Sequence, residues 1–120
     1  LLAMTGRTPG GARVSVNCFG RTQAWPGGAG TGELAELWGR AAEDLGFSTL
    51  PVARGGLSDA NYLCNLGPTL DGLGPFGEHA HCSENDPETG KRQELVYPDS
   101  FIPKACMNAL ALLRLDGRGD

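Results

Sequence analysis

Apolar and polar side chains alternate along residues 12–20 before the pattern changes to helical spacing. A period of two residues with β-branched members is typical of a strand with one buried face. The pattern therefore predicts a strand over 12–20, followed by a turn-rich connector that runs to Gly30. The apolar members of the strand are Ala12, Val14, Val16 and Cys18.

Two later segments place apolar residues three and four positions apart, which is the spacing of an amphipathic helix. The first begins at Thr31, a residue that can cap a helix, and stops before Gly46. Its predicted buried face contains Leu34, Leu37, Trp38, Ala41, Ala42 and Leu45. The second begins at Ser100 and tolerates Pro103 in its first turn. Its predicted buried face contains Ile102, Ala105, Cys106, Ala109, Leu110, Leu112 and Leu113.

The stretch between these helices predicts shorter elements. Short apolar runs predict strands over 47–52 and 69–73, and Ser58 or Asp59 can cap a short helix that ends near Leu66. Residues 85–92 are polar and indicate a surface insertion. Strands that alternate with helices are typical of α/β architecture, so we expect this fold class.

Composition excludes several classes of function. The 120 residues carry a formal net charge of −4, and no cluster of lysine and arginine with interleaved aromatic residues indicates nucleic-acid binding. No apolar run is long enough for a bilayer, so we expect no membrane partner. No signal peptide is visible, and we expect a cytoplasmic protein. The non-methionine start and glycine-rich tail lead us to expect a piece of a longer protein.

Four cysteines, with no C-x-x-C pair among them, argue against a zinc ribbon or a thioredoxin-type motif. We therefore expect reduced, mostly structural thiols. Cys82 adjoins a histidine and could act as a ligand or nucleophile, but a small side chain beside a site explains it as well.

The two histidines of the chain, His79 and His81, lie in one loop flanked by glycine and acidic residues. Imidazole is the commonest metal ligand in proteins and the usual proton carrier near neutral pH, so the loop is a candidate metal site. A solvated polar loop is the alternative, because H-x-H occurs in many unrelated contexts.

A second candidate site is the glycine-rich loop Gly55–Asp59, which follows a predicted strand. Backbone N–H groups, the Ser58 hydroxyl and a helix N-terminus could together hold a carboxylate or phosphate. The alternative is a tight turn in which Ser58 or Asp59 only caps the helix.

These motifs and two later ones stand in the order found in a known enzyme family. The chain has Gly-Gly-Leu-Ser-Asp-Ala-Asn at 55–61, Gly-Pro-Phe-Gly at 74–77, Ala80-His81, Glu-Leu-Val at 94–96 and Ser-Phe-Ile-Pro-Lys-Ala at 100–105. The series resembles the C-terminal third of the dizinc exopeptidases and deacylases, such as glutamate carboxypeptidase, aminoacylase, acetylornithine deacetylase and succinyl-diaminopimelate desuccinylase.

The resemblance implies a two-part organisation. Residues 1–24 would end an inserted αβ lid or dimerisation domain with its last strand, and residues 25–120 would form the C-terminal part of an α/β catalytic domain. It also implies a homodimer for the complete protein and a substrate that is a small peptide or an N-acyl amino acid.

Site residues carry over at three positions. His81 matches the family histidine that ligates one of two zinc ions, which cobalt or manganese could replace, whereas His79 matches no ligand. Ser58 matches a residue that holds the substrate carboxylate, and Arg21 falls near an arginine that reaches the substrate. The family acid after the histidine matches either Glu84 or Glu94.

The remaining metal ligands and the general-base glutamate of the family precede this segment. In the family the metals polarise the scissile carbonyl and activate a water, while the glutamate shuttles its proton. We therefore expect a fragment of a zinc hydrolase that is inactive alone. One alternative is a non-catalytic domain that binds a small molecule or a metal. Another is a self-contained H-x-H metal enzyme, which requires Asp59 or Asp71 beside both histidines.

Overall fold

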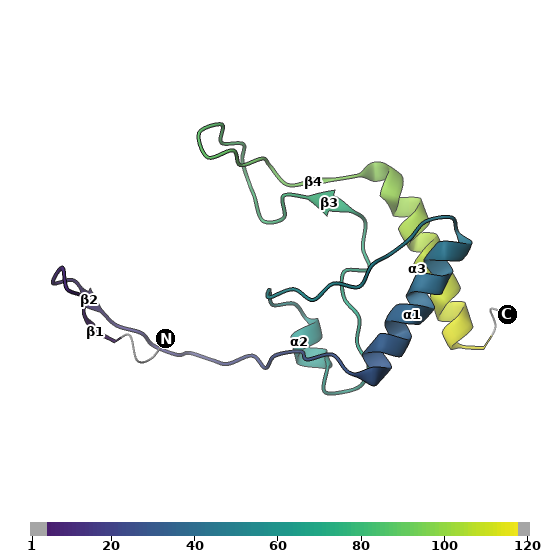
Figure 1. The fold of residues 1–120 in the computed structure, drawn as a ribbon, viewed down its shortest axis with the longest axis horizontal. Coiled ribbons are helices and arrows are strands. Elements are labelled where there is room, and N and C mark those ends of the chain that lie inside the picture. The colour runs from purple at the N-terminus through teal and green to yellow at the C-terminus, as the bar shows by residue number, and fades with distance from the viewer. Residues whose placement is uncertain (1–4, 118–120) are drawn as a thin grey trace.

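The computed structural model describes residues 5–117 and contains helices and two small antiparallel sheets (Figure 1). The chain thus combines helices and strands, as expected of an α/β class, although both of its sheets are antiparallel pairs. The first hairpin pairs β1 (Gly6–Arg7) with β2 (Arg13–Val14), and the second pairs β3 (Gly77–Glu78) with β4 (Leu95–Val96). The helices are α1 (Ala29–Asp44), the short α2 (Ala60–Leu63), the 3₁₀ turn η2 (Pro98–Ser100) and α3 (Phe101–Leu115).

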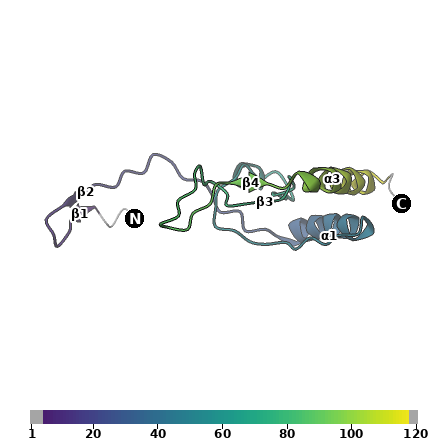
Figure 2. The same ribbon diagram turned by 90° about the horizontal axis from the view of Figure 1, so that it is seen from above.

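The hydrophobic core lies between α1 and α3, which stack in two layers (Figure 2). Trp38, Ala41 and Ala42 from α1 are buried against Met107 and Ala111 from α3. Partly buried leucines and one phenylalanine close the edges of this core: Leu34, Leu37, Phe47, Leu70, Leu73 and Leu110. None of the helices in the described part of the chain is both long and apolar enough to cross a membrane.

The expected helix over 31–45 is confirmed, with small differences at its ends. The helix begins at Ala29, and the Thr31 hydroxyl accepts the Thr69 N–H at 3.4 Å instead of capping the helix. Gly46 follows the helix in the left-handed region, with φ 84°, and its N–H bonds the carbonyl of Glu43. Leu45 was expected in the core but is 42% exposed.

The predicted buried face of α3 is wrong, although the helix itself forms where expected. The residues that face the core are Lys104, Met107, Asn108 and Ala111, on the side of the helix roughly opposite the predicted face. Of the seven residues expected in the core, only Leu110 is partly buried there. On the face that packs against α1, the Asn108 side-chain oxygen accepts the Trp38 indole N–H at 2.9 Å.

Three of the predicted strands do not form as predicted. Of residues 12–20, only Arg13 and Val14 join a ladder, and neither 47–52 nor 69–73 forms a strand. Leu50 is 84% and Val52 65% exposed, whereas Phe47, Leu70 and Leu73 pack against the helical core without a partner strand. A period-two pattern produces a strand only where a neighbouring strand accepts its backbone hydrogen bonds.

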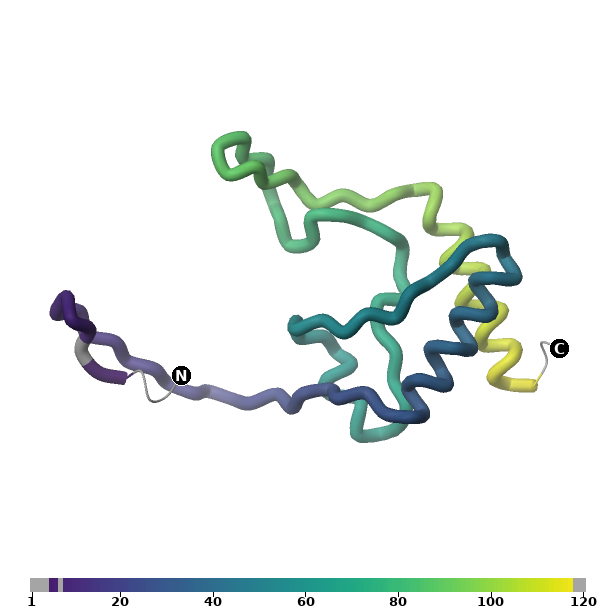
Figure 3. The backbone as a smooth tube through the Cα atoms, in the orientation of Figure 1, coloured from purple at the N-terminus to yellow at the C-terminus, as the bar shows by residue number. Residues whose placement is uncertain are grey.

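The chain is thin and extended. Residues 5–28 form an arm that leads from the first hairpin to α1 (Figure 3). The radius of gyration is 19.9 Å, whereas a compact domain of this length has about 14 Å. The arm is attached to the body near α2, where the side chain of Gln23 binds Asn65.

Candidate functional site

The two histidines lie in the loop that joins β3 to β4. The ladder pairs Gly77 with Val96 and Glu78 with Leu95, and the N–H of Tyr97 bonds the Phe76 carbonyl beside it. Gly77 is needed here, because a Cβ at this position would overlap the carbonyl oxygen of Leu95. The hairpin base is therefore fixed by backbone contacts that a larger residue would break.

Both histidines have left-handed backbone conformations. The φ angles are 59° at His79 and 68° at His81, and no other non-glycine residue among the described ones has a positive φ. The N–H of Cys82 bonds the His79 carbonyl at 3.1 Å, and the N–H of Glu94 bonds the Cys82 carbonyl at 2.8 Å, which hold this turn. Such conformations are disfavoured for L-residues and cluster at functional sites.

The two imidazoles differ in their surroundings. His79 Nε2 lies 3.6 Å from the Glu78 carboxylate, so this histidine has an acidic neighbour. His81 is exposed, and within residues 5–117 its side chain has no hydrogen bond or ion pair. His81 is therefore the histidine that is free to bind a ligand.

An open hollow of about 490 Å³ lies beside the base of the hairpin and is lined by both apolar and acidic residues. The acids are Glu78, in β3, and Glu94, which directly precedes β4. A hydrogen bond from Tyr97 to Glu78 raises the pKa of the tyrosine, because ionisation would place two negative charges together. Glu94 thus lies near the hairpin, whereas Glu84 does not line the hollow.

The Ser58 loop forms a hydrogen-bonded unit with the arm. The Ser58 N–H donates to the side-chain oxygen of Asn61 at 3.0 Å, and the Asn61 amide donates to the Gln23 carbonyl at 3.0 Å. Asn61 is only 6% exposed, so these bonds are shielded from water. Asn61 and Gln23 are positioning residues that the sequence analysis did not identify; the signal for Asn61 was its place in the Gly-Gly-Leu-Ser-Asp-Ala-Asn motif.

Two of the groups expected to bind an anion in the Ser58 loop already have hydrogen-bond partners within the chain. The Ser58 hydroxyl oxygen accepts the Ala60 N–H at 3.2 Å in a local turn, and the Ser58 N–H donates to Asn61, while α2 has Asp59 at its N-cap and no side-chain cap. The hydroxyl proton of Ser58 remains available as a donor. Helix α2 has four residues, too few to add a substantial dipole.

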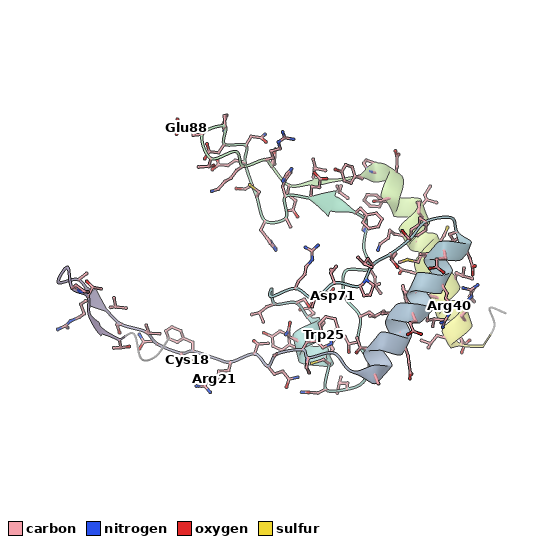
Figure 4. The ribbon with its side chains drawn as sticks, in the orientation of Figure 1. Cys18, Arg21, Trp25, Arg40, Asp71 and Glu88 are labelled. Atoms are coloured by element: carbon pink, nitrogen blue, oxygen red, sulfur yellow. The ribbon has the colours of Figure 1, made fainter. Side chains whose placement is uncertain are left out.

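Arg21 is exposed on the arm, two residues before Gln23 (Figure 4). Its side chain points away from the body in this view, so the structure does not bring it against Ser58. The arm that carries Arg21 and the loop that carries Ser58 are joined by the hydrogen bond from the Asn61 amide to the Gln23 carbonyl.

The described residues do not form a complete metal site. No three His, Cys, Asp or Glu side chains within residues 5–117 gather closely enough to hold a metal ion. Figure 4 places Asp71 in the centre of the body and Glu88 on the histidine hairpin, away from each other. The self-contained H-x-H enzyme therefore lacks the third ligand that it requires from Asp59 or Asp71.

Comparisons with known proteins leave the chain without an assigned relative. No family model matches it, and no curated protein or solved structure matches it significantly.

Proposed function

We propose that this chain is part of a metal-dependent hydrolase that cleaves a C-terminal amino acid or an N-acyl group from an amino acid. The proposal rests on the resemblance to the dizinc exopeptidases. Five motifs stand in the family order, and two of them carry the candidate site residues. In this proposal His81 ligates one zinc ion, and Ser58 and Arg21 bind the substrate carboxylate.

The observation that carries the proposal is the state of His81. Its imidazole is exposed and unpartnered within the described chain, and its backbone is strained in a hairpin anchored by Gly77. The left-handed backbone is shared with His79, so the assignment of His81 rests on its exposed imidazole and on its place in the Ala80-His81 motif. His79, by contrast, faces Glu78 and is assigned no ligand role.

The described residues do not fit a metal on their own, so the proposal assigns no catalytic step to this chain alone. The chain contributes one imidazole and part of the grip on the substrate carboxylate. The other ligands and the general base must come from a polypeptide outside these 120 residues. We therefore expect the purified chain with zinc to show no hydrolysis of peptides or N-acyl amino acids.

The coding sequence upstream of Leu1 provides the first test, because the proposal requires an H-x-D motif and a Glu-Glu pair there. The second test is a zinc titration of the longer protein against a chromophoric chelator. We expect His81→Ala to weaken zinc binding at least about tenfold, since a first-coordination ligand is lost. His79→Ala is the matched control and should change the affinity much less. Equal effects of the two substitutions would overturn the assignment of His81. Absence of the upstream motifs would favour a non-catalytic binding domain.

A further inference from the structure

The start of α3 is hydrogen-bonded to the base of the histidine hairpin (residues 77–96). The Phe76 N–H donates to the Ser100 hydroxyl oxygen at 2.9 Å, and the Ser100 hydroxyl donates to the Tyr97 carbonyl at 2.6 Å. Phe76 directly precedes β3, and Tyr97 directly follows β4. One hydroxyl therefore connects both ends of the hairpin to the residue at which the helix begins.

This hydroxyl takes the place of a backbone hydrogen bond in the ladder. The register that pairs Gly77 with Val96 would pair Phe76 with Tyr97 next, and the Tyr97 N–H does donate to the Phe76 carbonyl at 2.9 Å. In a regular antiparallel pair the Phe76 N–H would return this bond to the Tyr97 carbonyl. These are the two groups that Ser100 bridges, so a side chain from the start of α3 extends the ladder by one pair.

Ser100 is buried, and its hydroxyl does not cap its own helix. It occupies the N-cap position of α3, where a serine oxygen usually accepts an N–H of the first turn, but no such side-chain bond forms. The hydroxyl serves the hairpin instead. Because Ser100 is only 8% exposed, water does not readily replace its hydroxyl as the partner of the Phe76 N–H.

Two further side chains of α3 hold the segment that leads into the hairpin. Lys104 and Asn108 follow Ser100 at intervals of four residues, so the three lie on one face of the helix. The Lys104 ammonium donates to the Gly72 carbonyl at 3.4 Å and lies 4.8 Å from the centre of the Phe76 ring. The Asn108 amide donates to the next carbonyl along the chain at 3.1 Å. Residues 72–76 are therefore fixed along α3 up to the point at which Ser100 binds them.

The hairpin projects from the start of α3, away from the core between the two long helices (Figure 1). His81 lies in this projecting part, which is held together by its own ladder and by the bond from the Glu94 N–H to the Cys82 carbonyl. The direction in which the hairpin leaves the helix therefore determines where the His81 imidazole lies relative to the core.

We propose that Ser100 is a positioning residue, whose hydroxyl fixes the direction of the histidine hairpin relative to α3 and thereby places His81. The proposal gives a shared role to two motifs, because Phe76 belongs to Gly-Pro-Phe-Gly and Ser100 to Ser-Phe-Ile-Pro-Lys-Ala. Its consequence for metal binding rests on the proposed function, in which His81 ligates zinc. The fixed direction of the hairpin does not depend on that function.

The first test measures the direction of the hairpin in the 120-residue chain. Cys82 in the hairpin and Cys106 on α3 can carry spin labels once Cys18 and Cys64 are replaced by serine. Double electron–electron resonance then gives the distance between the two labels. We expect one narrow distance distribution in this parent chain, because the hairpin base is held to the helix.

Ser100→Ala should broaden or shift that distribution, whereas Ser100→Thr should retain it, since threonine keeps the hydroxyl. The Phe76 amide should also exchange at least about tenfold faster in Ser100→Ala, because it loses its acceptor. Ser48→Ala, at an exposed serine outside the hairpin, is the matched control and should change neither measurement. A broad distribution in the parent chain would overturn the proposal, as would unchanged distances in Ser100→Ala. Loss of the helical circular dichroism signal in Ser100→Ala would assign the hydroxyl to the core and would also overturn it.

The second test asks whether Ser100 acts through His81, and it uses zinc titration of the longer protein against a chelator. We expect Ser100→Ala to weaken zinc binding at least about threefold in the wild type and to have no effect in His81→Ala, because an effect that acts through a ligand disappears with that ligand. Equal weakening in both backgrounds would indicate a general structural effect and overturn the proposal. If His81→Ala left zinc affinity unchanged, the proposed function would fail, and the spin-label distances would still decide whether Ser100 fixes the hairpin.

Discussion

The indole N–H of Trp38 donates to the side-chain oxygen of Asn108 at 2.9 Å, and this bond joins α1 to α3 inside the core. The amide of Asn108 in turn donates to the Leu73 carbonyl at 3.1 Å. One polar side chain therefore connects both helices and the segment that leads to the histidine hairpin. Trp38 is only 9% exposed, so its N–H has little access to water as a replacement partner.

Asn108→Leu should destabilise the chain by about 1–3 kcal/mol, because it leaves the Trp38 N–H and the Leu73 carbonyl unpaired at similar side-chain volume. Urea unfolding followed by circular dichroism measures the change. Asn17→Leu is the control, since Asn17 is exposed on the arm, and it should stay within about 0.5 kcal/mol of the wild type. Equal stability of the two variants would show that the Asn108 bonds do not support the core.

Gly77→Ala should open the hairpin that carries the histidines. The new methyl group would overlap the Leu95 carbonyl oxygen in the neighbouring strand, and we expect a cost of about 1–3 kcal/mol and loss of the β3–β4 ladder. Hydrogen exchange at the amides of residues 77–78 and 95–97 reports on the ladder directly. Gly74→Ala is the matched control, because a Cβ there meets no atom within 4 Å. Slow exchange retained in Gly77→Ala would contradict the prediction.

The buried lysine of α3 should make stability depend on pH. Burial lowers the pKa of Lys104 from its ordinary value of 10.5, although its ammonium lies 4.8 Å from the centre of the Phe76 ring. Between the lowered and the ordinary pKa, the unfolded chain binds more protons than the folded chain. The contribution of this group to the free energy of unfolding therefore rises with pH across that window.

Lys104→Met removes this titration. The difference in unfolding free energy between wild type and Lys104→Met should shift in favour of the wild type as pH rises toward 10.5. Urea unfolding at several pH values measures it. Lys91→Met, at an exposed lysine outside the helical core, is the matched control. A difference that stays constant with pH would show that Lys104 is not desolvated in the folded chain.

The sequence predicts the helices of this protein better than its strands, and the reason is physical. A helix satisfies its own backbone, so the pattern over 31–45 suffices to place α1 within two residues at its N-terminal end. Strands over 47–52 and 69–73 need partners that residues 5–117 do not supply, and these segments stay irregular. The face of α3 was mispredicted because the face that packs against α1 contains Lys104 and Asn108, whereas apolar periodicity points to the other side of the helix.

The same limit applies to the candidate site. Motif order located Ser58 and His81, but only the structure shows that Asn61 holds the Ser58 N–H and that His81 is strained. A hydrogen bond between residues 38 positions apart, as between Asn61 and Gln23, leaves no periodic signal in the sequence. Contacts between residues that are distant in the sequence depend on tertiary packing, and the periodicity of the sequence carries no information about it.

The left-handed backbone at His81 predicts an inverted response to glycine. At most positions glycine is less stable than alanine, because it loses more conformational entropy on folding. At a φ of 68° the Cβ of alanine is disfavoured by about 1–2 kcal/mol, which glycine avoids. We therefore expect His81→Gly to be more stable than His81→Ala by up to about 1 kcal/mol in urea unfolding.

Ala105→Gly on α3 is the control for this comparison. Ala105 is an exposed residue in the middle of a helix, so glycine there should destabilise the chain by about 1 kcal/mol relative to alanine. The two sites should thus give opposite signs for the same pair of residues. If His81→Gly were instead the less stable variant, the backbone at His81 would not be left-handed in solution. The strain that supports a functional role for this histidine would then be absent.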